Sequence, residues 1–301
     1  MKQLVVLSGK GGTGKTCITA SFAHLASKGR DPAPAVLVDA DVDASNLELV
    51  LQPEIQDSHP FQGGSVAEID PELCEGCGTC ATICRFDAIL LPGTDGRFDY
   101  KVDPVACDGC AACVYTCPSS AIQMRQQISG DWYFSISPYG LLFHAALKPA
   151  QENSGKLVTL VKQQARLTAL DQGIELVLVD GPPGISCPVI SAASGASLAV
   201  VVAEPTAAGV HDLERVLDLA AHFNLPCLVC INKDDLYLPA TEQIERACLE
   251  RGVEVVGRIP FDQSVTEAMV QAMPVTFYRP ESPASLAIVK IWEVVLARLK
   301  N

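Results

Sequence analysis

A glycine-rich segment near the start of the chain has the residue types and spacing of a phosphate-binding loop. Residues 9–16, GKGGTGKT, match G-x-x-x-x-G-K-[ST] at every fixed position, between an apolar run and a segment with helical spacing. The glycines let backbone N–H groups surround a phosphate, Lys15 neutralises the β- and γ-phosphates, and the Thr16 hydroxyl binds Mg²⁺. A glycine turn without a ligand is the alternative, but the flanking strand and helix patterns favour a nucleotide. The predicted nucleotide site comprises Gly9, Lys10, Gly11, Gly12, Thr13, Gly14, Lys15, Thr16 and the following Cys17.

Eight of the 13 cysteines form two copies of a second pattern. Each copy reads C-x₂-C-x₂-C-x₃-C, and the second copy begins at Cys107, 33 residues after Cys74. Two complete runs of this spacing are typical of two [4Fe–4S] clusters, as in bacterial ferredoxins, where the fourth cysteine of each run binds the other cluster. The predicted ligands of the first cluster are Cys74, Cys77, Cys80 and Cys117, and those of the second are Cys84, Cys107, Cys110 and Cys113.

Zinc and disulfides are the alternatives for these cysteines. A zinc site would use two cysteine pairs separated by a longer loop, which differs from three cysteines at two-residue gaps. Disulfides are typical of secreted proteins, and the first apolar stretch is too short for a signal peptide. One difference separates the runs: Arg85 follows Cys84 where the second run has Pro118, and we expect its charge to raise the potential of one cluster.

The elements that position these motifs follow from hydrophobic periodicity. Short apolar runs that alternate with helical stretches specify βαβ units, so we expect an α/β fold with a doubly wound, mostly parallel sheet. The predicted strands are 2–8, 35–39, 174–179, 197–203, 227–231 and 253–259, and the predicted helices are 16–28, 157–170, 210–223, 240–250 and 283–300.

One segment interrupts this alternation. Residues 63–125 contain the eight patterned cysteines and no long helix or apolar strand run, so we interpret them as an inserted α+β ferredoxin domain. Residues 1–62 and 126–301 then form the nucleotide-binding domain, which the chain re-enters through an aromatic strand candidate at 131–139.

Composition excludes several functional classes. The chain has 301 residues, 49% of them hydrophobic, which favours one or two domains with a large core. A net charge of −13 argues against nucleic-acid binding, which needs clustered Lys and Arg. No apolar run is long enough to cross a bilayer, and the last helix has too few basic residues for a membrane anchor. We expect a soluble cytoplasmic protein.

A further lysine in the phosphate loop, Lys10, refines the prediction of a nucleotide site. The sequence KGGTGKT, with Lys10 ahead of Lys15, resembles the deviant loop of the MinD/ParA/Mrp and nitrogenase iron-protein family of ATPases. In that family the early lysine reaches the nucleotide of a partner subunit. The resemblance therefore implies ATP or ADP as the ligand, and an ATP-linked homodimer in which Lys10 and Lys15 are catalytic.

Other positions agree with the resemblance, which covers all of the chain except the insert. Asp41, in VDAD after the second strand, matches the aspartate that orients the attacking water, and we group it with Thr16 and Asp180 around Mg²⁺. Asp180, in DGPPG, matches the acid at the second switch. Asn232 and Pro260 match residues beside the adenine. Asp39 and Asp43 are more typical of structural caps.

The combination indicates an ATP-hydrolysing iron–sulfur protein that passes electrons to an unidentified partner under nucleotide control. Two alternatives stay open: an ATPase that assembles or carries iron–sulfur clusters, and a nucleotide-switched positioning protein with redox-sensing clusters. The remaining cysteines, Cys187, Cys227, Cys230 and Cys248, are expected to pack rather than react, and so is the thiol of Cys17.

Overall fold

The computed structural model describes residues 1–29, 32–91, 100–149 and 154–300. The chain forms two compact units. The first consists of Met1–His59, Trp132–Ala146 and Ser154–Asn301, and the second of Pro60–Asp131 and Leu147–Asn153. Each unit is described by itself below.

A nine-stranded sheet organises the first unit, in the order β11-β10-β9-β1-β8-β2-β7-β6-β3. Neighbouring strands from β11 to β7 are parallel, as predicted. The strands are β1 (Lys2–Ser8), β2 (Ala35–Asp39), β3 (Glu54–Ile69), β6 (Ile122–Ser137), β7 (Gly140–Leu147), β8 (Leu176–Pro183), β9 (Leu198–Ala203), β10 (Cys227–Asn232) and β11 (Glu254–Ile259).

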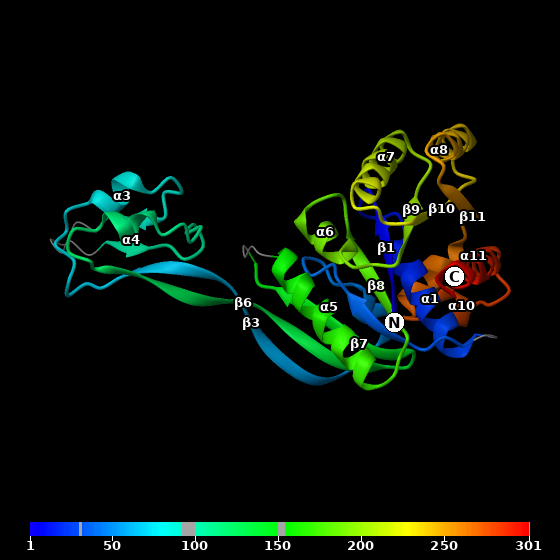
Figure 1. Ribbon diagram of the computed structural model, residues 1–301, viewed down its shortest axis with the longest axis horizontal. Helices are drawn as coiled ribbons and strands as arrows, with labels where there is room; N and C mark the ends of the chain where they lie inside the picture. The colour runs from blue at the N-terminus through cyan, green and yellow to red at the C-terminus, as the bar shows by residue number, and fades with distance from the viewer. Residues whose placement is uncertain (30–31, 92–99, 150–153, 301) are drawn as a thin grey trace. The chain divides into compact units, whose positions relative to one another are not determined.

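Helices cover both faces of this sheet (Figure 1). Leu4 and Val6 of β1 face a core cluster that also contains Phe22 of α1 and Trp292 of α11, while Val5 is buried on the other face. Because both faces are covered, the central strands are continuous apolar runs. The helices of this unit are α1 (Lys15–Lys28), α2 (Leu47–Leu51), α5 (Ser154–Asp171), α6 (Cys187–Ala193), α7 (Ala207–His222), α8 (Leu238–Glu250), α9 (Gln263–Val270), α10 (Val275–Tyr278) and α11 (Pro283–Lys300).

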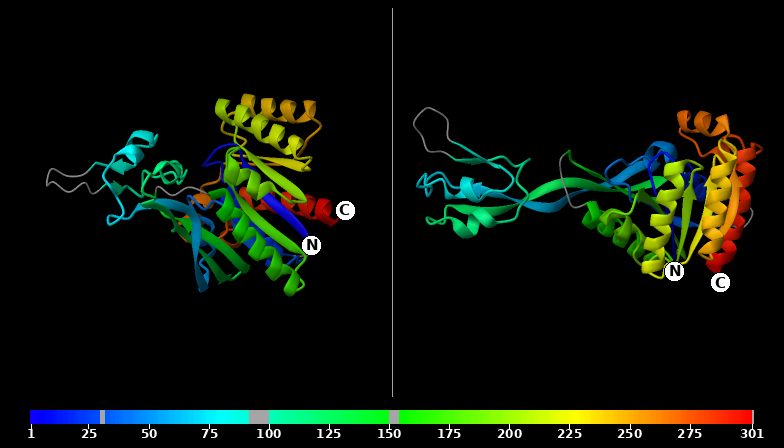
Figure 2. Two further views of the ribbon diagram at one scale, coloured as in Figure 1. Left: turned by 60° about the vertical axis from the view of Figure 1, so that its left-hand side comes forward. Right: turned by 90° about the horizontal axis from the view of Figure 1, so that it is seen from above.

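The second unit, whose ribbon is visible in Figure 2, contains both cysteine runs. Its described elements include α3 (Thr79–Ile83), α4 (Ala112–Thr116) and the two-stranded antiparallel sheet of β4 (Ile89–Leu90) and β5 (Lys101–Val102). A separate apolar cluster that includes Ala67 and Ile122 packs with Cys80 and Cys113. Part of the predicted insert, residues 92–99, lies outside the described residues.

The mostly parallel α/β fold is confirmed, and β1, β2 and α11 have the predicted bounds. Two strands reach into 63–125, which the sequence did not indicate: β3 runs on to Ile69 and β6 begins at Ile122. The predicted insert limits therefore fall inside two strands of 16 residues each. Most of β3 is exposed, so it lacks the apolar alternation by which a half-buried strand is recognised. The aromatic strand candidate is the end of β6, and β7 was missed.

Candidate functional site

The phosphate loop connects β1 to α1, and its backbone needs glycine at Gly14. The φ angle of Gly14 is 91°, and a Cβ there would lie 2.3 Å from Asn232 Nδ2. That amide donates a hydrogen bond to the carbonyl oxygen of Thr13 at 2.7 Å. Asn232, at the end of β10, thus holds the predicted loop in place from a strand that is distant in sequence.

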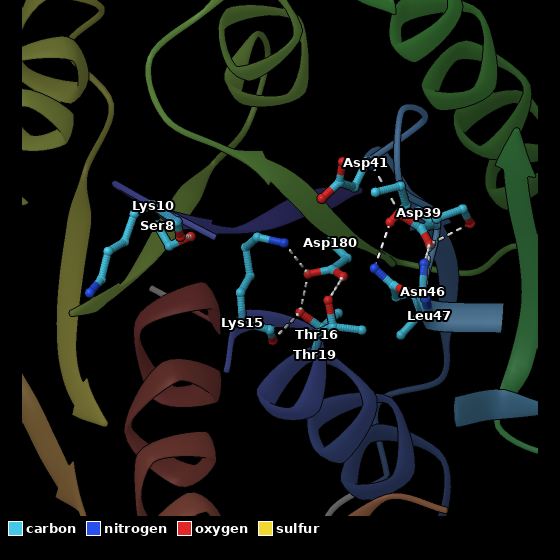
Figure 3. Close-up of polar contacts among 12 residues, drawn as sticks. Ser8, Lys10, Lys15, Thr16, Thr19, Asp39, Asp41, Asn46, Leu47 and Asp180 are labelled. Carbon is cyan, nitrogen blue, oxygen red and sulfur yellow. Dashed lines mark hydrogen bonds and ion pairs between the residues drawn. The ribbon is translucent and has the colours of Figure 1, made fainter. Parts of the chain in front are cut away.

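Three predicted residues meet at the start of α1 (Figure 3). The Thr16 hydroxyl donates to Asp180 Oδ2 at 2.7 Å, and Lys15 Nζ lies 3.4 Å from Asp180 Oδ1. Thr19, which the sequence analysis missed, has its hydroxyl 2.8 Å from the same Oδ1. Asp180 is 1% exposed, so Lys15 and these hydroxyl donors, rather than water, partner its carboxylate.

This donor set fits a magnesium nucleotide. Carboxylate and hydroxyl oxygens are the hard ligands that Mg²⁺ prefers, and Lys15 is placed to receive phosphate charge. Among the described residues, the buried hydroxyl of Thr13 has no hydrogen-bond partner. An orphaned polar group within a phosphate loop is consistent with a partner supplied by ligand.

Asp39 organises the segment that carries Asp41. Its fully buried carboxylate accepts hydrogen bonds from the backbone N–H groups of Asp41, Asn46 and Leu47 and from the Ser45 hydroxyl, at 2.8–3.1 Å. Burial, together with the charge of Asp180, raises the pKa of Asp39 to about 7. These contacts agree with the predicted capping role.

Asp41 is half-buried, and its side chain is drawn near Lys15 and Asp180 in Figure 3. Burial raises the pKa of Asp41, and the charge of Lys15 opposes that rise. The carboxylate is thus within the electrostatic reach of the phosphate loop. Its predicted role toward water and Mg²⁺ stays a prediction.

Lys10 is held by residues of its own chain. Its Nζ lies 2.8 Å from Glu204 Oε2 and 3.1 Å from Thr206 Oγ1. Lys233 binds the other carboxylate oxygen of Glu204 at 2.8 Å and reaches the Gly12 carbonyl at 3.3 Å. Although burial disfavours a charged carboxylate, the two lysines lower the pKa of Glu204. These partners were not predicted from the sequence, and only their positions at the ends of β9 and β10 could have indicated them.

Pro260 and Cys17, the two remaining residues of the predicted nucleotide site, are both half-buried. Pro260 follows β11, and the next residue, Phe261, donates its N–H to Asp235 Oδ1 at 2.7 Å. The Cys17 sulfur is 3.1 Å from the sulfur of Met269. Burial, together with the charge of Asp180, raises the pKa of Cys17 to about 11, which favours the protonated thiol.

The expectation that the other isolated cysteines pack was wrong for Cys187, which is exposed at the start of α6, whereas Cys230 and Cys248 are buried. All 13 cysteines are free thiols. Burial raises the pKa of Cys230 to about 12 and that of Cys248 to about 11. Cys227 is half-buried three residues before Cys230 on β10, and desolvation raises its pKa too.

The eight patterned cysteines line two cavities in the second unit. Cys74, Cys77, Cys80 and Cys117 line the first cavity. Cys84, Cys107, Cys110 and Cys113 line the second cavity. Each cavity therefore gathers three cysteines of one run and the fourth cysteine of the other, which is the grouping that the spacing predicts.

The chemistry of both linings fits an iron–sulfur cluster. Each offers four thiols beside apolar side chains, Ile69 and Ile122 in the first cavity and Ala67 and Ile89 in the second. Among the described residues, no three His, Cys, Asp or Glu side chains come close enough to hold a single metal ion. In a [4Fe–4S] cluster each cysteine binds a different iron, so its ligands stand farther apart than those of one ion.

Some of these sulfurs accept hydrogen bonds from the protein. The Ala88 and Ala121 N–H groups donate to the Cys84 and Cys117 sulfurs at 3.4 and 3.3 Å. Hydrogen bonding with Thr79 lowers the pKa of Cys77. Desolvation raises the pKa of Cys80 and of Cys113.

No helix among the described residues is long and apolar enough to cross a membrane.

Comparison with known proteins gives one family. Residues 4–275 match the model of the CobQ/CobB/MinD/ParA nucleotide binding domain. An uncharacterised protein of Methanocaldococcus jannaschii is 33% identical over 231 residues, which cover 77% of this chain and 78% of that protein. The iron-sulfur cluster carrier protein of Pyrococcus abyssi is 22% identical, and the match covers 99% of this chain and 87% of that protein.

Solved structures show the same fold. The septum site-determining protein MinD of Pyrococcus horikoshii, complexed with Mg-ADP, matches with a TM-score of 0.60 at 20% identity, over 100% of this chain and 98% of its own. The MinD cell division protein of Aquifex aeolicus matches with a TM-score of 0.57 at 18% identity, over 99% of this chain and 98% of its own.

Proposed function

The chain belongs to the CobQ/CobB/MinD/ParA family of nucleotide-binding proteins, and from that premise we propose an ATPase that carries two [4Fe–4S] clusters and passes their electrons to a protein partner under nucleotide control. The nucleotide half of this proposal rests on the family and on the Lys15, Thr16 and Asp180 contacts. The iron–sulfur half rests on the second unit.

The observation that carries the proposal is the composition of the two cavities. Each is lined by four cysteines drawn from both runs, in the grouping expected of a two-cluster ferredoxin. When bound, such clusters would supply one-electron redox chemistry. Four complete ligands for each cluster favour retention, which suits electron transfer better than delivery of the cluster.

The nucleotide-site residues would have distinct roles. Lys15 would hold the β- and γ-phosphates, Thr16 and Asp180 would hold Mg²⁺, and Asp41 would orient the attacking water. In an ATP-linked homodimer Lys10 would leave Glu204 and reach the partner's nucleotide. Asn232 and Pro260 would lie beside the adenine.

The test is anaerobic preparation of the full chain followed by iron and sulfide analysis and an ATPase assay. We expect about eight iron atoms per chain and slow ATP hydrolysis that the Lys15→Ala variant loses while it keeps its iron. Thr159→Val is a control, because that exposed hydroxyl lies on α5 and, in the described part of the chain, bonds to the Gly155 carbonyl. Iron that is absent after reconstitution, or hydrolysis that survives in Lys15→Ala, would contradict the proposal.

A second candidate, cluster delivery, is favoured by the relatives that are named iron-sulfur cluster carrier proteins. The two functions differ in which protein holds the iron after incubation with an acceptor. Incubation of the loaded chain with an apo-ferredoxin and MgATP should leave iron on this chain if it transfers electrons. Iron that moves to the acceptor, at a rate that depends on ATP, would support delivery.

A further inference from the structure

The two cysteine runs share one local backbone. Residues 33 positions apart have matching left-handed conformations: Gly76 and Gly109 have φ angles of 69° and 73°, and Asp87 and Ser120 have 50° and 52°. The two cavities are therefore comparable position by position, and differences between them arise from side chains.

Two hydroxyl groups lie against sulfurs of the first cavity. Thr79 Oγ1 is 3.5 Å from the Cys77 sulfur, and Ser119 Oγ is 3.6 Å from the Cys117 sulfur. Both cysteines line that cavity, although they come from different runs. A cysteine bound to iron is a thiolate without a proton, so in each pair the hydroxyl must be the donor.

The second cavity has apolar side chains at the equivalent positions. Ala112 corresponds to Thr79, and Phe86 corresponds to Ser119; both line the second cavity. Neither side chain has a hydrogen-bond donor. None of the described residues that line this cavity carries a hydroxyl group, whereas the first cavity also has Tyr100 in its lining.

The backbone donors do not produce a similar difference. The Ala88 N–H is 3.4 Å from the Cys84 sulfur, and the Ala121 N–H is 3.3 Å from the Cys117 sulfur. These bonds are equivalent in the two runs. The side-chain hydroxyls are the donors that distinguish the cavities.

We propose that Thr79 and Ser119 set the reduction potential of the cluster in the first cavity above that of the cluster in the second. This rests on the proposed function, because it needs both clusters to be present. Reduction adds one electron to a cluster and increases the negative charge on its sulfurs. A hydrogen bond to a ligand sulfur stabilises that added charge and so raises the potential.

Arg85 acts in the opposite direction but more weakly. It follows Cys84, a ligand of the second cavity, and its positive charge alone would raise the potential there. The Arg85 side chain is exposed, so water and salt screen its charge. Direct hydrogen bonds to sulfur outweigh a screened charge, which reverses the order that the sequence alone suggested.

The test is an EPR-monitored redox titration of the reconstituted full chain, with dithionite supplying one electron to each cluster. In the double variant Thr79→Val, Ser119→Ala, the higher of the two potentials should fall, and the lower one should stay. We expect about a tenfold change in the reduction equilibrium constant, which is about 59 mV for a one-electron couple. Ala112→Thr should conversely raise the lower potential.

Thr82→Val is the matched control. Its exposed hydroxyl lies on α3, the helix of Thr79, but bonds to the Gly78 carbonyl at 3.3 Å and contacts no sulfur in the described structure. The iron content of every variant separates the proposed function from the role of the hydroxyls, because chains that assemble no clusters contradict the proposed function. Intact clusters whose higher potential does not move in the double variant, or moves equally in Thr82→Val, would overturn the role of the hydroxyls.

Discussion

Single side chains in the nucleotide site are held by partners that lie far away in sequence. Lys10 contacts Glu204 and Thr206, and Asn232 holds the loop through the Thr13 carbonyl. The loop itself was predictable because its spacing is local. Glu204 and Thr206 were not, since only the folded sheet brings the ends of β9 and β1 together.

The Asp41→Ala variant tests the residue at which hydrolysis would occur. Loss of the carboxylate removes the group proposed to orient water but leaves Lys15, Thr16 and Asp180, the proposed MgATP ligands. We expect hydrolysis to fall by about 10²-fold or more, with ATP binding retained in equilibrium dialysis. Asp43→Ala, two positions away and exposed, is the control and should keep its activity. Unchanged turnover in Asp41→Ala would contradict the assignment.

At the scale of elements, the central strands, the end of β6 and the last helix were predictable, whereas β3 and the first part of β6 were not. The central strands are buried on both faces and read as apolar runs, for example β2, AVLVD. By contrast, β3 is polar and largely exposed, and β6 mixes exposed and buried positions without clean alternation. Their partners in the sheet, rather than their own sequence pattern, make them strands.

Helix α6 depends on a buried lysine from α5. Lys162 Nζ donates to the carbonyl oxygens of Ser191, Ala192 and Ser194 at 2.5–2.7 Å and thereby caps the C-terminal end of α6. Lys162→Met would leave three acceptors without this donor. We expect a loss of about 3 kcal/mol in the free energy of unfolding, measured by denaturant titration. A loss below the error of that measurement would contradict the capping role.

Wild type and Lys162→Met also allow a test of the pKa of Lys162. Burial lowers the pKa of Lys162 from 10.5 to about 8. Between these two values the folded protein has lost a proton that the unfolded chain retains, so this group's contribution to the free energy of unfolding rises with pH. Denaturant titrations at about pH 7.5 and about pH 9.5 should show wild type gaining stability relative to Lys162→Met. An unchanged or smaller difference at the higher pH would be inconsistent with the lowered pKa.

The fourth cysteine of each run lines the cavity of the other run, and this gives another prediction. Cys117 follows α4 but lines the cavity of the first run. Cys117→Ser should therefore disturb the cluster that the first run holds, which in our account has the higher potential. In an EPR titration the higher-potential signal should weaken or change shape. Loss of the lower-potential signal alone would indicate that each run binds its own cluster.

At the scale of the whole molecule, one chain combines a nucleotide-binding unit with a unit that gathers eight cysteines. The sequence predicted this combination, because the two cysteine runs follow the segment that carries Asp39 and Asp41. Strands β3 and β6 each belong partly to one unit and partly to the other. Two continuous strands therefore connect the nucleotide-binding unit to the proposed cluster unit.

The central claim is that nucleotide and clusters are coupled, and a redox titration of the full chain with and without MgATP tests it most directly. We predict a shift of about 60 mV in at least one cluster potential, which corresponds to roughly 1.4 kcal/mol of coupling. The shift should disappear in Lys15→Ala, whose clusters remain intact. Equal potentials with and without MgATP, in a protein shown to bind ATP and to carry both clusters, would contradict nucleotide-gated electron transfer.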